Sequence, residues 1–199
     1  MKWPFRAFDH SQHEYLGSEH GHSNRRLHKR QGSGPKHSQP ARVQGGAFPG
    51  QALRTVAILR YLGKKHGLDA RTERDAMELS LLEQQAHDLQ WALVLTSMNP
   101  NTTQARESHE RNLADSLSQW QKHLKTRKWA LGDSLTYVDF LLYEAFDWNR
   151  HFAPGVFEGR PEILNYLKRF EELPKLKEYF ASDKYTKWPI MAPYMFWGH

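Results

Sequence analysis

The apolar residues of this chain follow a regular spacing only after about residue 52, and this limits what the protein can fold into. Residues 1–50 are broken repeatedly by glycine and proline, contain Val43 as their only valine or isoleucine, and show neither helical nor strand periodicity. Such a segment cannot bury enough apolar surface to offset the entropy that is lost on ordering. We therefore expect residues 1–51 to be a poorly ordered segment, and the core to come from the rest of the chain.

The positive charge is distributed just as unevenly. The 199 residues carry a formal net charge of +6, and residues 1–50 contain eight Lys or Arg against three acids. The remainder is nearly neutral, so the basic character says little about its partners. The chain has no cysteine, which excludes disulfides and cysteine-based metal or redox centres. No apolar run approaches the roughly 20 residues that cross a membrane, so we expect no membrane partner and a cytoplasmic location.

The stretch "HGHSNRRLHKRQGSGPKH", residues 20–37, holds four histidines and five Lys or Arg without an acid. Imidazoles bind transition metals, but this spacing matches no ordered metal site. The cluster "RRLHKR" offers cations to nucleic-acid phosphates, but no aromatic residues alternate with them. An out-of-frame or wrongly joined exon of a GC-rich gene would also encode such a composition. We favour this third interpretation, and expect neither a metal site nor a nucleic-acid partner.

After residue 52 the pattern becomes helical, which predicts a mainly α fold. Thr55 can cap a short helix that Gly67 closes. Thr72 and Asp75 have the spacing of an N-terminal cap pair, and Pro100 ends the helix that they begin. Further helices are expected over residues 104–126, about 137–149, from Pro161 onward and about 175–182. The residues expected to face the core are Leu82, Ala86, Leu89, Leu93, Leu113, Leu117, Trp120 and Leu124.

The segment "GDSLTYVDFLLYEAFDW", residues 132–148, contains a capping box variant. Thr136 and Asp139 are three positions apart, so the acid can reach back to the amide of the cap residue. An apolar run follows directly. The pattern predicts an apolar helix that is fixed at its start, and by itself it indicates no function.

With its flanks, this segment resembles the helical domain of cytosolic glutathione S-transferases, particularly the mu class. The stretches "RKWALGDSLTYVDFLLYEAFDWNRHF" and "RPEILNYLKRFEELPKLKEYFASDKYTKWPI" carry the resemblance. "TVAILRYLGKKHGL" is similar to the last helix of the family's thioredoxin-like domain, and "LEQQAHDLQWAL" to the long helix beside the dimer interface and active-site cleft. The tail "KWPIMAPYMFWG" resembles invertebrate members.

The resemblance covers about residues 53–198 and implies three parts. Residues 1–51 do not resemble the family. Residues 52–68 are similar to a remnant of the thioredoxin-like α/β domain, and residues 69–199 to the helical bundle. We therefore expect a glutathione S-transferase C-terminal-type bundle that follows at most a remnant of the first domain.

The resemblance also implies an activity, the conjugation of reduced glutathione to hydrophobic electrophiles for detoxification. It implies a homodimer, with glutathione as co-substrate and no other cofactor. In mu members an N-terminal tyrosine hydroxyl stabilises the glutathione thiolate. Tyr15 is the one tyrosine before residue 51, but nothing before it resembles a strand, so we assign no catalytic residue. We expect impaired activity; the alternative is a non-catalytic module that holds apolar ligands between the helices and the tail.

Three residues are similar to glutathione-binding positions of the family. Arg54 and Thr55 match a Gln-Ser pair that holds the γ-glutamyl carboxylate at a helix N-terminus. A solvated Arg54 beside a simple cap at Thr55 is the other interpretation. Asp88 matches an aspartate that reaches across the dimer to the glutathione amino group, although it can equally be an ordinary exposed acid.

The apolar substrate pocket is the last implied site. Met98 stands where many mu members have a tyrosine that assists some substrates, and a methionine cannot donate that hydrogen bond. Ordinary packing is the alternative role for each predicted lining residue. Those residues are His87, Val94, Met98, Met191 and Ala192.

Overall fold

The computed structural model describes the backbone of residues 48–198 and the side chains of residues 55–198. The predictions for Tyr15, for the stretch 20–37 and for the order of residues 1–47 lie outside these residues. The elements are α1 (Phe48–Lys65), α2 (Glu73–Ser97), α3 (Thr102–Leu124), α4 (Tyr137–Phe152), the 3₁₀ helix η1 (Pro154–Phe157), α5 (Pro161–Glu171) and α6 (Pro174–Phe180). The described part contains no strand, so the prediction of a mainly α bundle is confirmed.

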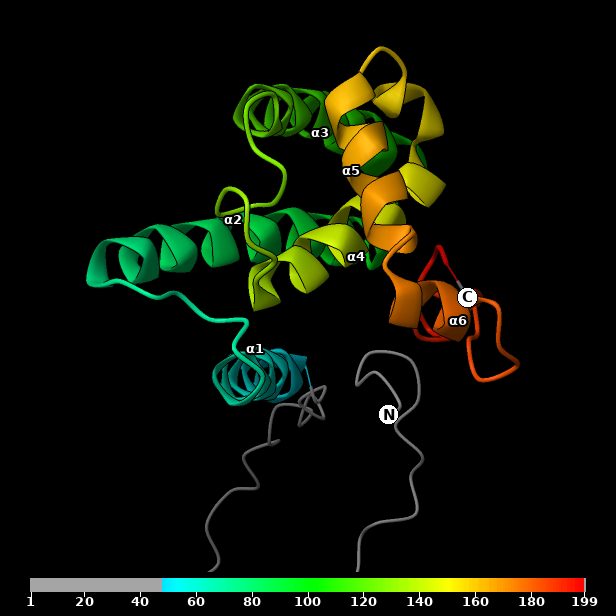
Figure 1. Ribbon diagram of the computed structural model, residues 1–199. Coiled ribbons are helices and arrows are strands. Elements are labelled where there is room, and N and C mark those ends of the chain that lie inside the picture. The colour runs from blue at the N-terminus through cyan, green and yellow to red at the C-terminus, as the bar shows by residue number, and fades with distance from the viewer. Residues whose placement is uncertain (1–47, 199) are drawn as a thin grey trace, which may run out of the picture.

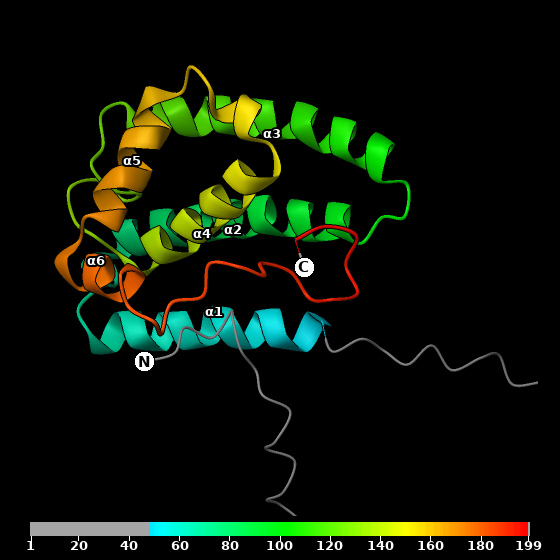
Figure 2. The same cartoon turned by 90° about the vertical axis from the view of Figure 1, so that its right-hand side faces the viewer.

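The long helices α2 and α3 lie side by side and are joined by a short turn (Figures 1 and 2). Helix α4 packs against α2, and α5 packs against α3, so these four helices enclose the core. Helix α1 lies on the other side of α2 from α3. The non-helical tail runs between α1 and the bundle in Figure 2.

Two of the predicted helix starts are confirmed. The hydroxyl of Thr72 accepts a hydrogen bond from the Asp75 amide at 3.1 Å. At α4, the Asp139 carboxylate accepts from the Thr136 amide at 2.8 Å and from the Thr136 hydroxyl at 2.9 Å. The same carboxylate also accepts from the Ala130 amide (2.7 Å) and the Tyr166 hydroxyl (3.0 Å). The cap pair therefore ties the start of α4 to the preceding loop and to α5.

The predicted start of the first helix is wrong. Helix α1 begins at Phe48, so Thr55 lies inside it and is buried instead of forming an N-cap. The residues before Thr55 explain the difference. Pro49 is tolerated in a first helical turn, and the run Ala52–Arg54 consists of strong helix formers.

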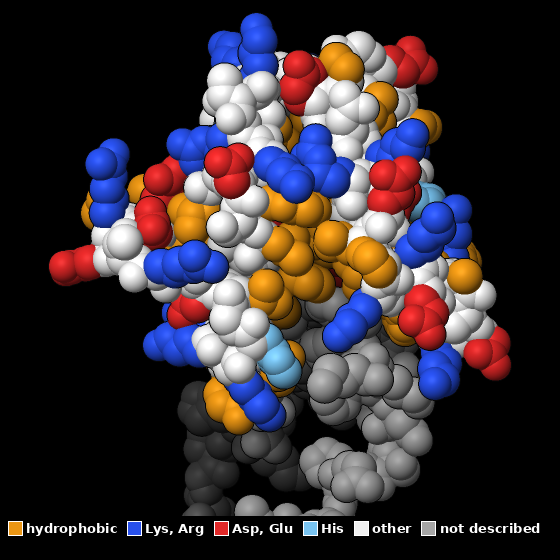
Figure 3. Space-filling model, viewed as in Figure 1, with side chains coloured by type: hydrophobic (Ala, Val, Ile, Leu, Met, Phe, Trp, Pro, Cys, Tyr) orange, Lys and Arg blue, Asp and Glu red, His pale blue; other side chains and the backbone are white. Residues whose placement is uncertain are grey.

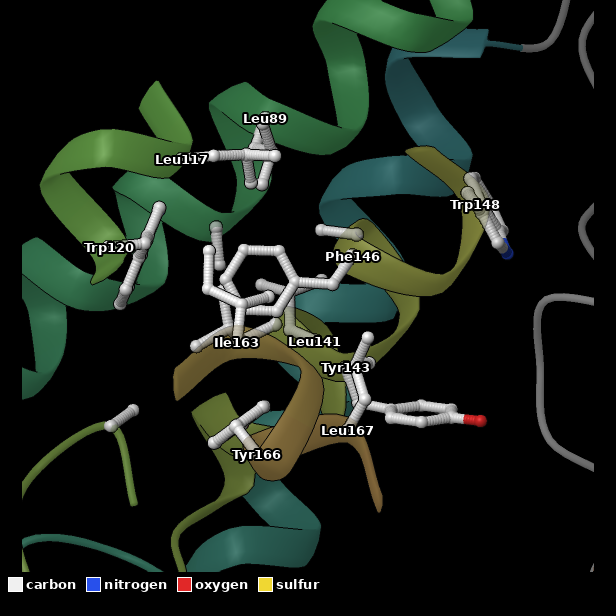
Figure 4. Packing of buried hydrophobic residues seen from close by; sticks show 14 of the residues in the cluster. Leu89, Leu117, Trp120, Leu141, Tyr143, Phe146, Trp148, Ile163, Tyr166 and Leu167 are labelled. Atoms are coloured by element: carbon white, nitrogen blue, oxygen red, sulfur yellow. The ribbon is translucent and has the colours of Figure 1, made fainter. Parts of the chain in front are cut away.

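The core lies between α2, α3, α4 and α5. All eight residues predicted to face it are buried. Leu89 and Leu117 point toward each other from α2 and α3 (Figure 4). The Phe146 ring contacts Trp120 and Tyr166 edge to face, with ring centres 5.8 and 5.9 Å apart. Such pairs stabilise a core beyond the area they bury.

Candidate functional site

Helix α2 presents different faces to α3 and to the tail. On the α3 side, Asp88 is exposed and accepts a hydrogen bond from the Gln84 amide at 2.6 Å. It lines a groove of about 950 Å³ between α2 and α3. About half of the groove lining consists of uncharged amide and hydroxyl side chains, such as Gln85, Gln104, Ser108, Asn112, Ser116 and Gln119.

His87 lies one position away and is half-buried. The indole N–H of Trp91 donates to His87 Nε2 at 2.7 Å. In the neutral ring the proton must then sit on Nδ1. Burial lowers the pKa of His87, while the charges of Asp88 and Glu83 oppose this shift. The neutral imidazole therefore has one N–H available to donate.

The tail meets the C-terminal end of α2. The Phe196 amide donates to the Ser97 carbonyl at 2.7 Å. Met191 is buried in the core, and Val94 and Ala192 pack against that core. Met98 is 43% exposed at the C-cap of α2. The structure thus gathers three predicted pocket residues on one apolar core and leaves Met98 at its edge.

An ion-pair cluster that the sequence did not reveal joins α1 to the bundle. The buried Glu83 carboxylate accepts from Arg60 Nε at 2.7 Å and Nη2 at 2.6 Å, and from the Tyr137 hydroxyl at 2.7 Å. Burial raises the pKa of Tyr137, and the hydrogen bond to Glu83 raises it further. Gly63 packs against the same ring, since a Cβ at this position would lie 2.7 Å from Tyr137 Cδ1. Helix α1 is therefore held on the bundle by charge and by close packing.

Comparison with known proteins decides the family. Residues 87–183 match the family described as "Glutathione S-transferase, C-terminal domain". The solved glutathione S-transferase Blo t 8 superimposes with a TM-score of 0.68 at 35% identity, over 73% of this chain and 70% of that one. The chain belongs to the glutathione S-transferase family.

The curated relatives that this chain matches include mu-class proteins. It is 35% identical to the class-mu 26 kDa isozyme 7 of Fasciola hepatica, over 68% of this chain and 62% of that protein. It is 33% identical to glutathione S-transferase Mu 2 of Rattus norvegicus, over 71% of this chain and 65% of that protein. The chain thus spans less than two thirds of the length of these relatives.

The predicted glutathione contacts of this family member lie on two elements. Arg54 lies in α1, and its side chain is outside the described residues. Thr55 is buried in the middle of α1, whereas the free amides of the first helical turn lie near Phe48. Asp88 lies on α2 and opens onto the groove. The structure therefore does not bring Thr55 and Asp88 together within one described pocket.

Two polar side chains on α2 and α3 were not predicted. Gln90 is buried, and its Nε2 has no hydrogen-bond partner among residues 55–198. His109 is buried, with Nε2 2.7 Å from Asn149 Oδ1 and Nδ1 3.1 Å from the Thr96 hydroxyl. Burial lowers the pKa of His109. Each interrupts an apolar stripe, which is the local signal that could have identified them.

Residues 55–198 offer no metal site and no membrane span. Within them, no group of three or more His, Cys, Asp or Glu side chains could hold a metal ion. None of their helices combines the length and the apolar character that spanning a bilayer requires.

Proposed function

We propose that this glutathione S-transferase conjugates reduced glutathione to hydrophobic electrophiles in the cytoplasm. Its family membership supports the reaction class. The docking of the tail on α2 supports the electrophile site, because the Phe196–Ser97 hydrogen bond holds an apolar wall at the C-terminal end of α2, where Val94, Met191 and Ala192 meet one core. Val94, Met98, Met191 and Ala192 would line that site, and His87 Nδ1 would donate to an electrophile oxygen.

We propose further that the active form is a homodimer in which α2 and α3 face the partner. Met77, Leu81 and Leu95 of α2 are 66%, 60% and 63% exposed. Large apolar side chains this exposed on one helix are typical of an interaction surface. Asp88 opens onto the groove beside them. In such a dimer, Asp88 would contribute to the glutathione site of the other subunit.

Turnover by this chain is expected to be slow. Tyr15, the first tyrosine of the sequence, does not follow a strand-like stretch, as the tyrosine that stabilises the thiolate in mu members does. Loss of one donor that stabilises developing negative charge costs roughly 10²–10³-fold in kcat. The chain should therefore still bind glutathione, while its kcat for conjugation is low.

A second candidate is a non-catalytic module that binds apolar ligands. Hydrophobic side chains gather in the middle of one face of the molecule, with charged groups around them (Figure 3). Contiguous apolar surface of this kind favours a ligand or partner contact. This candidate requires no thiolate chemistry.

Two assays on one sample separate the candidates. Retention on glutathione-agarose with elution by free glutathione, together with slow conjugation of an aryl halide, would support the enzyme. Failure to bind glutathione, with saturable binding of an apolar dye, would support the module and refute the enzyme. A Met98→Tyr variant is compared with the wild type in both assays. It places the tyrosine hydroxyl donor of many mu members at the edge of the apolar wall, and it does not change the charge.

A further inference from the structure

A second hollow lies where the end of α3 meets α5. Its volume is about 440 Å³. The lining combines the end of α3 and the loop that follows it with one face of α5, and α3 packs against α5. The lining residues are Leu124, Lys125, Thr126, Arg127, Lys128, Glu162, Asn165 and Arg169. Four of them are cations and one is a carboxylate.

The two guanidinium groups are held in place. Arg169 Nη1 donates to the Lys128 carbonyl at 2.6 Å, and its guanidinium lies 5.8 Å from the centre of the buried Trp129 ring. Arg127 forms an ion pair with Glu78. A guanidinium has five N–H donors in a fixed fork, so both groups keep donors for a ligand. Groups fixed in advance lose less entropy when they bind.

The two ammonium groups are uncommitted. Lys125 and Lys128 are exposed, and across residues 55–198 their side chains show no hydrogen bond or ion pair. The carboxylate of Glu162 accepts a hydrogen bond from the Gln121 amide. The one acid in the lining is therefore partly occupied elsewhere, while two cations face the hollow without a counter-charge of their own.

Charge balance separates a ligand site from ordinary helix-end stabilisation. The C-terminus of α3 carries about half a negative charge, which cations in the following loop stabilise. Glu162 and Glu78 add two full negative charges. Four cations still leave an excess of about one and a half positive charges. A phosphate monoester carries about −1.5 to −2 near neutral pH, which matches that excess.

We propose that this hollow binds a phosphate monoester, with the forks of Arg127 and Arg169 on the phosphate oxygens and Lys125 and Lys128 neutralising the dianion. Arginine matches phosphate through paired N–H···O bonds, and lysine acts as a point charge. The hollow is larger than a phosphate group, so an organic substituent fits beside Asn165 and Thr126. The site shares no lining residue with the α2–α3 groove. The proposed phosphate binding therefore does not depend on the proposed conjugation of glutathione.

The test titrates the full chain with inorganic phosphate and with phenyl phosphate at constant ionic strength, followed by calorimetry. We expect saturable binding that is tighter for phenyl phosphate. A Lys125→Ala/Lys128→Ala double variant should weaken it at least about tenfold. The matched control is Lys175→Ala/Lys177→Ala on α6, which removes the same charge from exposed positions outside the hollow. Non-saturable binding, or equal loss in both variants, would overturn the proposal.

A third variant tests the forked geometry. Arg169→Lys keeps the charge and removes the paired donors, so phosphate binding should weaken several-fold, with the melting temperature recorded to confirm folding. Unchanged affinity in this variant would refute the arginine contacts. Co-sedimentation with phosphatidic acid vesicles, against phosphatidylcholine vesicles, identifies the source of the monoester. Lysine-dependent pelleting assigns a lipid headgroup, and phenyl phosphate binding without pelleting assigns a soluble monoester.

Discussion

The Tyr137 hydroxyl at the start of α4 donates to the Glu83 carboxylate of α2 at a distance of 2.7 Å. Glu83 also receives two hydrogen bonds from Arg60 of α1. One buried carboxylate thus connects three helices. The long helix that carries the candidate site is joined at this point both to the bundle and to the helix that resembles the end of a thioredoxin-like domain.

Removing this carboxylate should destabilise the fold. Breaking a buried ion pair by deleting one partner costs about 3–5 kcal/mol. The Arg60 side chain is 55% exposed, so solvent screening reduces the expected loss for Glu83→Ala to about 2 kcal/mol. Tyr137→Phe deletes a single hydrogen bond and should cost about 1 kcal/mol. Urea unfolding measures the free energy of unfolding for both variants.

The control for this prediction is the exposed pair Arg106–Glu110 on α3. Glu110→Ala should cost less than about 0.5 kcal/mol, because exposed ion pairs contribute little. If Glu83→Ala were no more destabilising than Glu110→Ala, the Glu83 cluster would not hold α1 on the bundle.

The sequence predicted the bundle because its signals are local. Thr72 and Thr136 begin helices through partners three positions away, and the apolar stripes recur within single helices. Glu83 could not be found in this way. Its partners Arg60 and Tyr137 are 23 and 54 positions away, and an acid in an amphipathic helix is ordinarily read as solvent-exposed.

The candidate site was predictable to a smaller extent. Val94 and Met191 meet the same core, as expected from their apolar character. The position of Thr55 was misjudged because a cap residue and a helix interior differ only in what precedes them, and Pro49 did not stop the helix. The glutathione roles of Arg54, Thr55 and Asp88 stay predictions, since they depend on chain partners that local patterns do not specify.

Stability should fall as the pH is lowered below about 6.5. Burial lowers the pKa of His109 and of His87 in the folded protein, whereas the unfolded residues titrate near 6.5. The unfolded chain therefore binds more protons between the folded values and 6.5, and protonation favours unfolding there. The stability that the two neutral histidines contribute is fully present above about pH 6.5 and is lost as the pH falls toward their folded-state pKa values. His109 can contribute at most about 1.4 kcal/mol per pH unit.

Melting temperatures recorded from neutral to mildly acidic pH check this expectation. His109→Gln should flatten the decrease, because Gln can still donate to Asn149 but does not titrate in this range. His87→Gln should flatten it less, since His87 is only half-buried and solvent screens its charge. An identical pH profile in wild type and His109→Gln would contradict the assignment.

The folded conformation of the tail should depend on Gly198. Gly198 has φ +86°, and a Cβ there would lie 2.7 Å from Met191 Cγ. Gly198→Ala combines a left-handed conformation with a close contact, which should cost about 1–3 kcal/mol. It should also weaken apolar-dye binding, because the Gly198 carbonyl accepts from the Ile190 and Met191 amides. Gly155→Ala is the control, since nothing lies within 4 Å of its added methyl group. Equal effects of both variants on dye binding would show that the tail does not form part of the apolar site.

The proposed dimer should dissociate when α2 loses its apolar surface. Leu81 is 60% exposed, and in a two-fold dimer each change at this position occurs twice in the interface. Leu81→Glu should raise the dimer dissociation constant at least tenfold, about 1.4 kcal/mol. Leu164→Glu on α5, where the side chain is 40% exposed, is the matched control and should leave it unchanged. Sedimentation over a concentration series measures both. A wild-type chain that stays monomeric throughout the series would exclude the dimer and the contribution of Asp88 across it.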